Sequence, residues 1–235
     1  MQILSLCGLL ALCSCGLVAQ TPGDEATTVP MTIEKRVAGF LPNYRTADGT
    51  LPFEPISAKR KWTIAAKDSF DYPVYILSGL FSGIGQISNQ NPSFGRGLSG
   101  YGKRFASGYA DQAIGNLLAE GTLPALLRED PRYFRVGPGG GSDAHRVRYA
   151  LTRIFATKTD RNTMRFNFSE IGGNALSTAI SNAYLPDQRN ANANTRKFVI
   201  AIGTDAFSNL IKEFWPDVKR KMQSHKAAIH PQGSP

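Results

Sequence analysis

Residues 198–214, FVIAIGTDAFSNLIKEF, carry an apolar side chain at every fourth position: Phe198, Ile202, Ala206, Leu210 and Phe214. Spacing of four places these side chains on one face of an α-helix, so the segment predicts an amphipathic helix. Asn194 or Thr195 is suited to cap its start. Pro216 is expected to end it and to begin a basic final helix.

Capping residues and prolines divide the preceding chain into further helical segments. We expect helices at residues 58–70, 73–88, 101–120, 123–127, 143–157 and from 167 or 169 to 184, with loops at 89–100 and 136–142. No stretch alternates apolar and polar residues as a strand would. The chain therefore predicts an all-α fold, a bundle of about six to seven helices rich in small residues, after a signal peptide and a proline-rich extended strap.

Small residues recur four positions apart within these helices. The pairs are Gly79 with Gly83, Ser78 with Ser82, Ala106 with Ala110, and Ala175 with Ala179. Such spacing makes a flat groove that lets two helix backbones approach closely, as is common in membranes. A tightly packed soluble bundle uses the same pattern, and both interpretations stay open.

Two long segments carry little or no charge. Residues 72–95 contain no charged side chain, but their apolar part ends near Ile87, which is short for a membrane span. Residues 171–186 are also uncharged yet rich in Asn, Ser and Thr. Both suit a buried bundle or a half-inserted hairpin better than a full crossing.

The first 19 residues are typical of a secretory signal peptide, with a short apolar core at 3–12. Cleavage after Ala19 is one interpretation; lipidation at Cys15 is the alternative. All three cysteines lie in this segment, so cleavage after Ala19 excludes disulfides and thiolate chemistry from the mature chain. We then expect a flexible leader at 20–35, one helical domain at 36–222 that begins with the strap, and a flexible basic tail at 223–235.

Isolated carboxylates on separate helices are the candidate chemical groups. Asp111, Glu170 and Asp205 each precede an asparagine by four or five residues, namely Asn116, Asn174 and Asn209. Spacing of four puts both groups on one helix face, so converging faces would give a polar centre for a cation, a head group or catalysis. In the competing interpretation each acid pairs with a nearby Arg or Lys.

Metal and cofactor sites are not indicated by the remaining residues. His145, at a helix start, is a weak candidate base, and no Glu-x-x-His pair or His/Cys cluster occurs. We expect no metal and no cofactor.

The net charge of +9 is concentrated in two regions. Residues 128–165 hold nine basic against four acidic residues, and residues 217–235 hold four against one. Export makes nucleic acid an unsuitable partner, whereas an anionic lipid or envelope surface fits. The expected contacts are Arg146, Arg148, Arg153, Lys219, Arg220 and Lys221, unless this charge serves only solubility.

Five short motifs carry a resemblance to known proteins. They are GYGKRF (100–105), YAD (109–111), DPRYFR (130–135), SNAY (181–184) and KEFWPD (212–217). Together they resemble an uncharacterised family of exported proteins from acidobacterial genomes, over roughly residues 37–222. The resemblance implies a Gram-negative envelope setting but no known activity, so it transfers no catalytic residue.

Two functions remain in competition. The first is an exported, periplasmic or outer-membrane-associated helical protein with a structural or interaction role, bound to lipid or to an envelope protein. The second is an envelope enzyme that acts on lipid or cell-wall material through Asp111, Glu170 and Asp205, with His145 or Arg148. The sequence leans toward the first.

Overall fold

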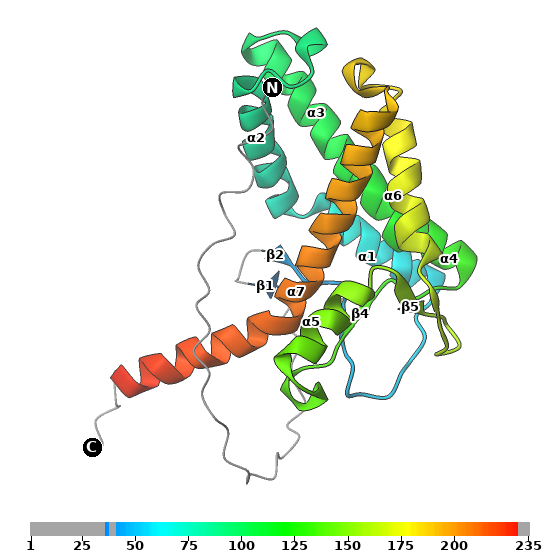
Figure 1. Ribbon diagram of the computed structural model, residues 1–235, viewed down its shortest axis with the longest axis vertical. Helices are drawn as coiled ribbons and strands as arrows, with labels where there is room; N and C mark the ends of the chain where they lie inside the picture. Colours follow the sequence, from blue (N-terminus) through cyan, green and yellow to red (C-terminus); the bar gives the residue numbers. More distant parts are fainter. Residues whose placement is uncertain (1–35, 38–40, 230–235) are drawn as a thin grey trace. The chain divides into compact units, whose positions relative to one another are not determined.

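The computed structural model describes residues 36–37 and 41–229, and its helices dominate the fold (Figure 1). The all-α prediction is confirmed. The helices are α1 (Ala58–Phe70), α2 (Tyr72–Ile87), α3 (Gly97–Asn116), α4 (Leu123–Leu127), α5 (Asp143–Thr152), α6 (Phe168–Ser181) and α7 (Ala191–Ile229). Short 3-10 turns lie at Pro92–Phe94, Pro138–Gly140 and Pro186–Gln188, and a π-helical segment, Leu117–Thr122, joins α3 to α4. The segments predicted to be a signal peptide and a leader, with Cys15, lie outside the described residues.

Local capping explains where several helices begin. The Ser57 side chain accepts a hydrogen bond from the Arg60 amide at the start of α1, and Asn167 accepts one from Glu170 at the start of α6. Pro73 lies in the first turn of α2, where its missing N–H costs no hydrogen bond. These three starts agree with the sequence prediction.

Other helix boundaries differ from the prediction. The helix α5 begins at Asp143, as predicted, with Ser142 as its N-cap, but it ends at Thr152 rather than 157 because the chain then enters a strand. The helix α3 begins at Gly97, inside the expected loop.

The last helix is longer than predicted in both directions. The segment α7 begins at Ala191 and runs through Pro216 to Ile229, so the expected break is absent and residues 223–229 are helical rather than a flexible tail. Proline removes one backbone hydrogen bond and bends a helix without always ending it. Figure 1 shows α7 changing direction in its C-terminal half.

Three short two-stranded pairs were not predicted. The strands β1 (Arg36–Val37) and β2 (Leu41–Pro42) are antiparallel, as are β5 (Ala156–Lys158) and β6 (Met164–Phe166). The pair β3 (Thr46–Asp48) and β4 (Tyr133–Arg135) is parallel and fastens the strap to the helical body. Gly49 continues this pairing, and a Cβ there would lie 2.5 Å from the Arg135 carbonyl oxygen.

One small residue shows why the helices approach closely. A Cβ on Gly173 of α6 would lie 2.6 Å from the Cα of Ala119 in the π-helical segment. By contrast, a Cβ on Gly83 of α2 would meet no atom within 4 Å. Close packing therefore requires glycine at the α6 crossing but not on this part of α2.

The interior of the described chain is unusually polar. Its buried residues include more polar or charged side chains than apolar ones, while large apolar side chains are exposed on α2, α6 and α7. Within the described residues, no helix combines the length and apolar character needed to cross a bilayer. The buried charges form the site described next.

Candidate functional site

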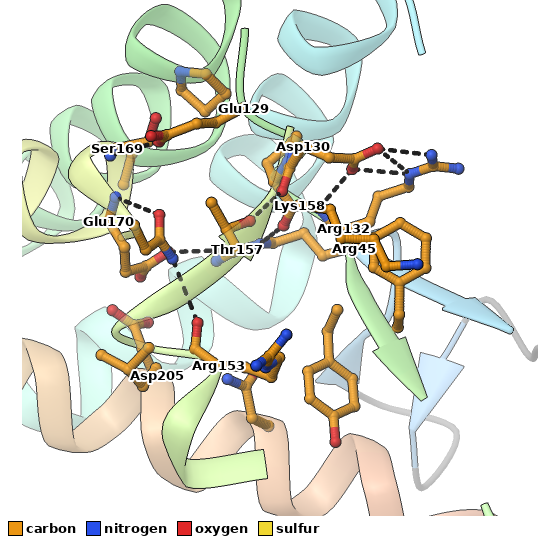
Figure 2. A pocket seen from close by; sticks show the side chains of 18 of the residues that line it. Arg45, Glu129, Asp130, Arg132, Arg153, Thr157, Lys158, Ser169, Glu170 and Asp205 are labelled. Carbon is orange, nitrogen blue, oxygen red and sulfur yellow. Dashed lines mark hydrogen bonds and ion pairs between the residues drawn. The ribbon is translucent and has the colours of Figure 1, made fainter. Parts of the chain in front are cut away.

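Arg45 of the strap joins two helical segments at the centre of the molecule. Its Nη1 lies 2.9 Å from Glu120 Oε1 and its Nη2 lies 2.9 Å from Glu170 Oε2. Strand pairing places the residue, because the Tyr133 amide donates to the Arg45 carbonyl at 2.7 Å. Nε donates to the Pro131 carbonyl at 3.1 Å. The strap thus supplies a cation that pairs with two buried acids, and Figure 2 shows Arg45 with one of them, Glu170.

The buried acids occur as two neighbouring carboxyl pairs. Asp68 of α1 lies beside Glu120, and Glu170 of α6 lies beside Asp205 of α7. Two carboxylates this close repel each other when both are ionised, so each neighbour helps burial to raise the pKa of Glu120 and of Asp205. Figure 2 shows Glu170 and Asp205 next to each other on their two helices.

Burial sets the titration of these acids. It raises the pKa of Asp68 and raises those of Glu120 and Asp205 well above their usual range. Burial also opposes ionisation of Glu170, but Arg45, Asp205 and Lys212 together outweigh it and hold the Glu170 pKa below the ordinary value. The two acids of the second pair are therefore shifted in opposite directions.

Asn174 connects the second pair to its helix. Its Nδ2 donates to the Glu170 carbonyl at 3.0 Å and to Asp205 Oδ2 at 3.2 Å. The expected juxtaposition of Glu170, Asn174 and Asp205 is therefore present in the structure. Asn209 instead donates to the Ala150 carbonyl at 3.4 Å, and Asn116 accepts from Gln112 at 2.9 Å.

Lys212 of α7 is the second cation of the cluster. It is 8% exposed, and within the described residues its Nζ makes neither a hydrogen bond nor an ion pair. Burial and the neighbouring Arg45 lower its pKa, while Asp68, Glu120 and Asp205 attract it over a longer range. A buried ammonium without a close partner is costly, which makes this side chain notable.

A cavity of about 540 Å³ adjoins the cluster. Its polar end, where α2 begins and α3 ends, is lined by Arg45, Asp68, Glu120, Asp205 and Lys212. Its apolar wall includes Leu77 and Phe81 of α2 and Phe207 and Ile211 of α7. This volume lies in the range of ligand sites, about 300–1000 Å³.

Asp111 does not join the carboxyl pairs, which corrects the expectation that all three candidate acids converge. It lines the cavity, but its Oδ1 accepts from Tyr184 at 2.5 Å and its Oδ2 lies 3.1 Å from Lys197 Nζ. This acid follows the competing prediction of pairing with a basic residue. The Asp111 contacts also raise the pKa of Tyr184, after the larger effect of burial.

His145 and Arg146 lie away from the carboxyl pairs. His145 is exposed at the start of α5, where Ser142 accepts from its backbone amide. Arg146 is 2% exposed and binds Glu213 and Asp217, so its expected role on an anionic surface is wrong. Periodicity could not show this, because the acids that bury it come from α7.

The other basic candidates differ in availability. Arg148 and Lys221 are exposed, and Arg220 is exposed but lies 2.5 Å from Asp217. Arg153 lies over the Tyr149 ring, and Lys219 is half-buried. Fewer basic residues are therefore exposed to an anionic surface than the sequence indicated.

The motifs identified in the sequence bind one another in the fold. Glu213 of KEFWPD accepts from Tyr133 of DPRYFR at 2.8 Å and from Arg146 at 2.9 Å. Tyr184 of SNAY donates to Asp111 of YAD. Arg104 of GYGKRF donates to four backbone carbonyls around the 90–100 loop. These motifs therefore hold the tertiary structure together.

The comparisons with known proteins add no relative. No protein-family model matches the chain, and no curated protein and no solved structure is significantly similar to it. Within the described residues, no group of three His, Cys, Asp or Glu side chains is placed to hold a metal ion.

Proposed function

We propose that this chain is an exported, membrane-associated protein of the cell envelope that acts by binding rather than by catalysis. The observation that carries the proposal is the exposed apolar face of α2. Ile76, Leu80, Ile84 and Ile87 are 48–90% exposed and recur every three or four residues. Such a stripe is normally buried, and a lipid surface would cover it.

Other large apolar side chains are exposed as well. They are Phe81 of α2, Leu176 and Ile180 of α6, and Val199 and Ile200 of α7. Tyr72 and Tyr75, at the start of α2, are half-exposed aromatic residues of the kind found at membrane interfaces. These features support peripheral docking, with apolar side chains entering the lipid and aromatic residues at its boundary.

Exposed basic residues support an anionic lipid as the partner. Arg148 and Lys221 are available to a surface, and each basic side chain near such a membrane contributes about 1 kcal/mol. Salt screens this attraction but leaves the apolar contribution in place. Binding should therefore weaken, without disappearing, at high ionic strength.

Vesicle flotation with the purified chain tests the proposal. Vesicles that contain phosphatidylglycerol should carry the protein, and L80E or I84E should reduce the bound fraction severalfold. L126E is the matched control, because Leu126 is an exposed leucine on α4. Unchanged binding of L80E and I84E, or equal loss in L126E, would overturn docking through α2.

A second candidate function follows from the meeting of Glu170 and Asp205 beside a cavity. A protonated and an ionised carboxyl group could act as acid and base on a lipid or cell-wall substrate. Hydrolysis of such material that is lost in both E170Q and D205N would establish an enzyme. Activity retained in both variants, or absent from the native chain, would leave the binding function as proposed.

A further inference from the structure

Lys212 lies where the polar cluster meets the apolar cavity. The residue is 8% exposed and lines the cavity, and its ammonium makes no hydrogen bond among the described residues. The adjoining lining from α2 and α7 includes Leu77, Phe81, Phe207 and Ile211, with serine and threonine residues between them. A site with one unsatisfied cation beside an apolar chamber is complementary to an anion that carries an apolar chain.

We infer that the cavity binds a single-chain amphiphile with a carboxylate head group. The head group accepts hydrogen bonds from Lys212, and the chain lies along Leu77, Phe81, Phe207 and Ile211. The inference goes beyond membrane docking, because it assigns a ligand to the cavity. Leu80 and Ile84 of the proposed docking face do not line this cavity, whereas Phe81 belongs to both.

The charge balance of the cluster favours an anion over a cation. Burial raises the pKa of Glu120 and of Asp205 well above the ordinary value, which disfavours a second negative charge in each carboxyl pair. Arg45 and Lys212 are the basic residues beside these acids in the cavity lining. A carboxylate therefore meets the basic Lys212 side chain, whereas an alkylammonium would be repelled by it.

The head group also satisfies a buried donor. The Lys212 ammonium has three N–H groups, and without a ligand its closest charged neighbours act only over a longer range. A charge-assisted hydrogen bond to a carboxylate is stronger than a neutral one. An alcohol of the same chain length keeps the apolar contacts but loses this interaction.

Calorimetric titration of the full chain, without vesicles, compares three amphiphiles of equal chain length below their micelle concentrations. Dodecanoate should bind about tenfold more tightly than dodecanol, the difference expected for one charge-assisted hydrogen bond. Dodecylammonium should bind more weakly than either. Equal affinities, tighter binding of dodecylammonium, or no binding of dodecanoate would overturn the inference.

Two variants locate the ligand. K212M should lower dodecanoate affinity about tenfold and leave dodecanol affinity unchanged, because methionine keeps the volume but not the charge. G108F should abolish binding of both, since Gly108 lines the cavity and a Cβ there meets no atom within 4 Å. G102F is its matched control, because Gly102 is equally open on the same helix but lies outside the cavity lining.

The design separates this inference from membrane docking. L80E should lose vesicle binding and still bind dodecanoate, whereas G108F should do the reverse. If K212M does not fold, the ligand series on the native chain and the G108F and G102F pair still decide the result. Dodecanoate binding that survives G108F would place the ligand elsewhere and refute the assignment.

Discussion

Arg45 Nη2 lies 2.9 Å from Glu170 Oε2, although 125 residues separate the two in the chain. The same guanidinium also holds Glu120, so one strap residue neutralises acids from the π-helical segment and from α6. The strap is therefore part of the charge cluster rather than a covering segment.

Loss of the Arg45 guanidinium should greatly lower the free energy of unfolding. R45M leaves the charges around Glu120 and Glu170 without their cation, and breaking buried ion pairs in this way costs about 3–5 kcal/mol. Urea unfolding should show this loss in the free energy of unfolding. R60A, at an exposed position on α1, should change it by less than about 0.5 kcal/mol. A similar small change in R45M would show that the cluster contributes little.

Stability should fall as the pH rises above the usual range of free carboxyl groups. Burial raises the pKa values of Glu120 and Asp205 in the folded chain, so between the unfolded and folded values the folded state holds more protons. The free energy of unfolding then decreases with pH through that window. The lowered pKa of Glu170 acts in the opposite sense, and its contribution is lost only as the pH falls through its folded value.

Urea unfolding at a series of pH values measures this dependence. D205N removes the carboxyl group whose pKa burial raises, so its free energy of unfolding should decline less steeply toward alkaline pH than that of the native chain. An equal or steeper decline in D205N would contradict a raised pKa of Asp205 in the folded chain.

Two glycine variants should have opposite effects. G173A forces a Cβ to within 2.6 Å of the Ala119 Cα and should destabilise the fold by about 1–3 kcal/mol. G83A meets no atom within 4 Å and should be neutral or stabilising by up to about 1 kcal/mol, because alanine favours the helix. Thermal unfolding of both compares the two positions. A stabilising G173A would show that α6 does not require this close approach.

Loss of the Glu213 carboxylate should strongly lower the free energy of unfolding. Its carboxylate is fully buried and accepts from Arg146, from the Tyr133 hydroxyl and from the Gly137 amide. E213A should cost about 3–5 kcal/mol, because it leaves the buried Arg146 with one fewer partner. E54A, at an exposed glutamate, is the control for the same chemical change. Urea unfolding that shows equal effects would refute the role of Glu213 in the fold.

Helix positions followed from local patterns. Each of these patterns depends on residues within one or two helical turns. They are the apolar residue at every fourth position from Phe198 to Phe214, the Ser57 and Asn167 caps, and Pro73 in the first turn of α2. Local sequence patterns were less informative about where the helices end. Thr152 ends α5 because the following residues pair as β5 with β6, and Pro216 is accommodated within α7.

The candidate site was only partly predictable for the same reason. Spacing placed Glu170 and Asn174 on one face, and the uncharged surroundings of Asp205 marked it as unusual. Nothing near Arg45 in the sequence distinguishes it from other basic residues, and the KEFWPD motif that contains Lys212 does not indicate a role for this lysine. Their roles arise where the strap, α6 and α7 meet, and the acids that surround them come from distant segments.

The sequence by itself determined the helical class, most helix positions and the groups from which a polar centre could form, because these depend on periodicity, capping and residue type. Only the tertiary structure decided that Glu170 meets Asp205 while Asp111 pairs with Lys197 and Tyr184. It also decided that Arg146 is buried and that Lys212 lies beside a cavity. Burial and charge pairing are properties of contacts between remote segments, and those contacts set the free energy of each ionised group.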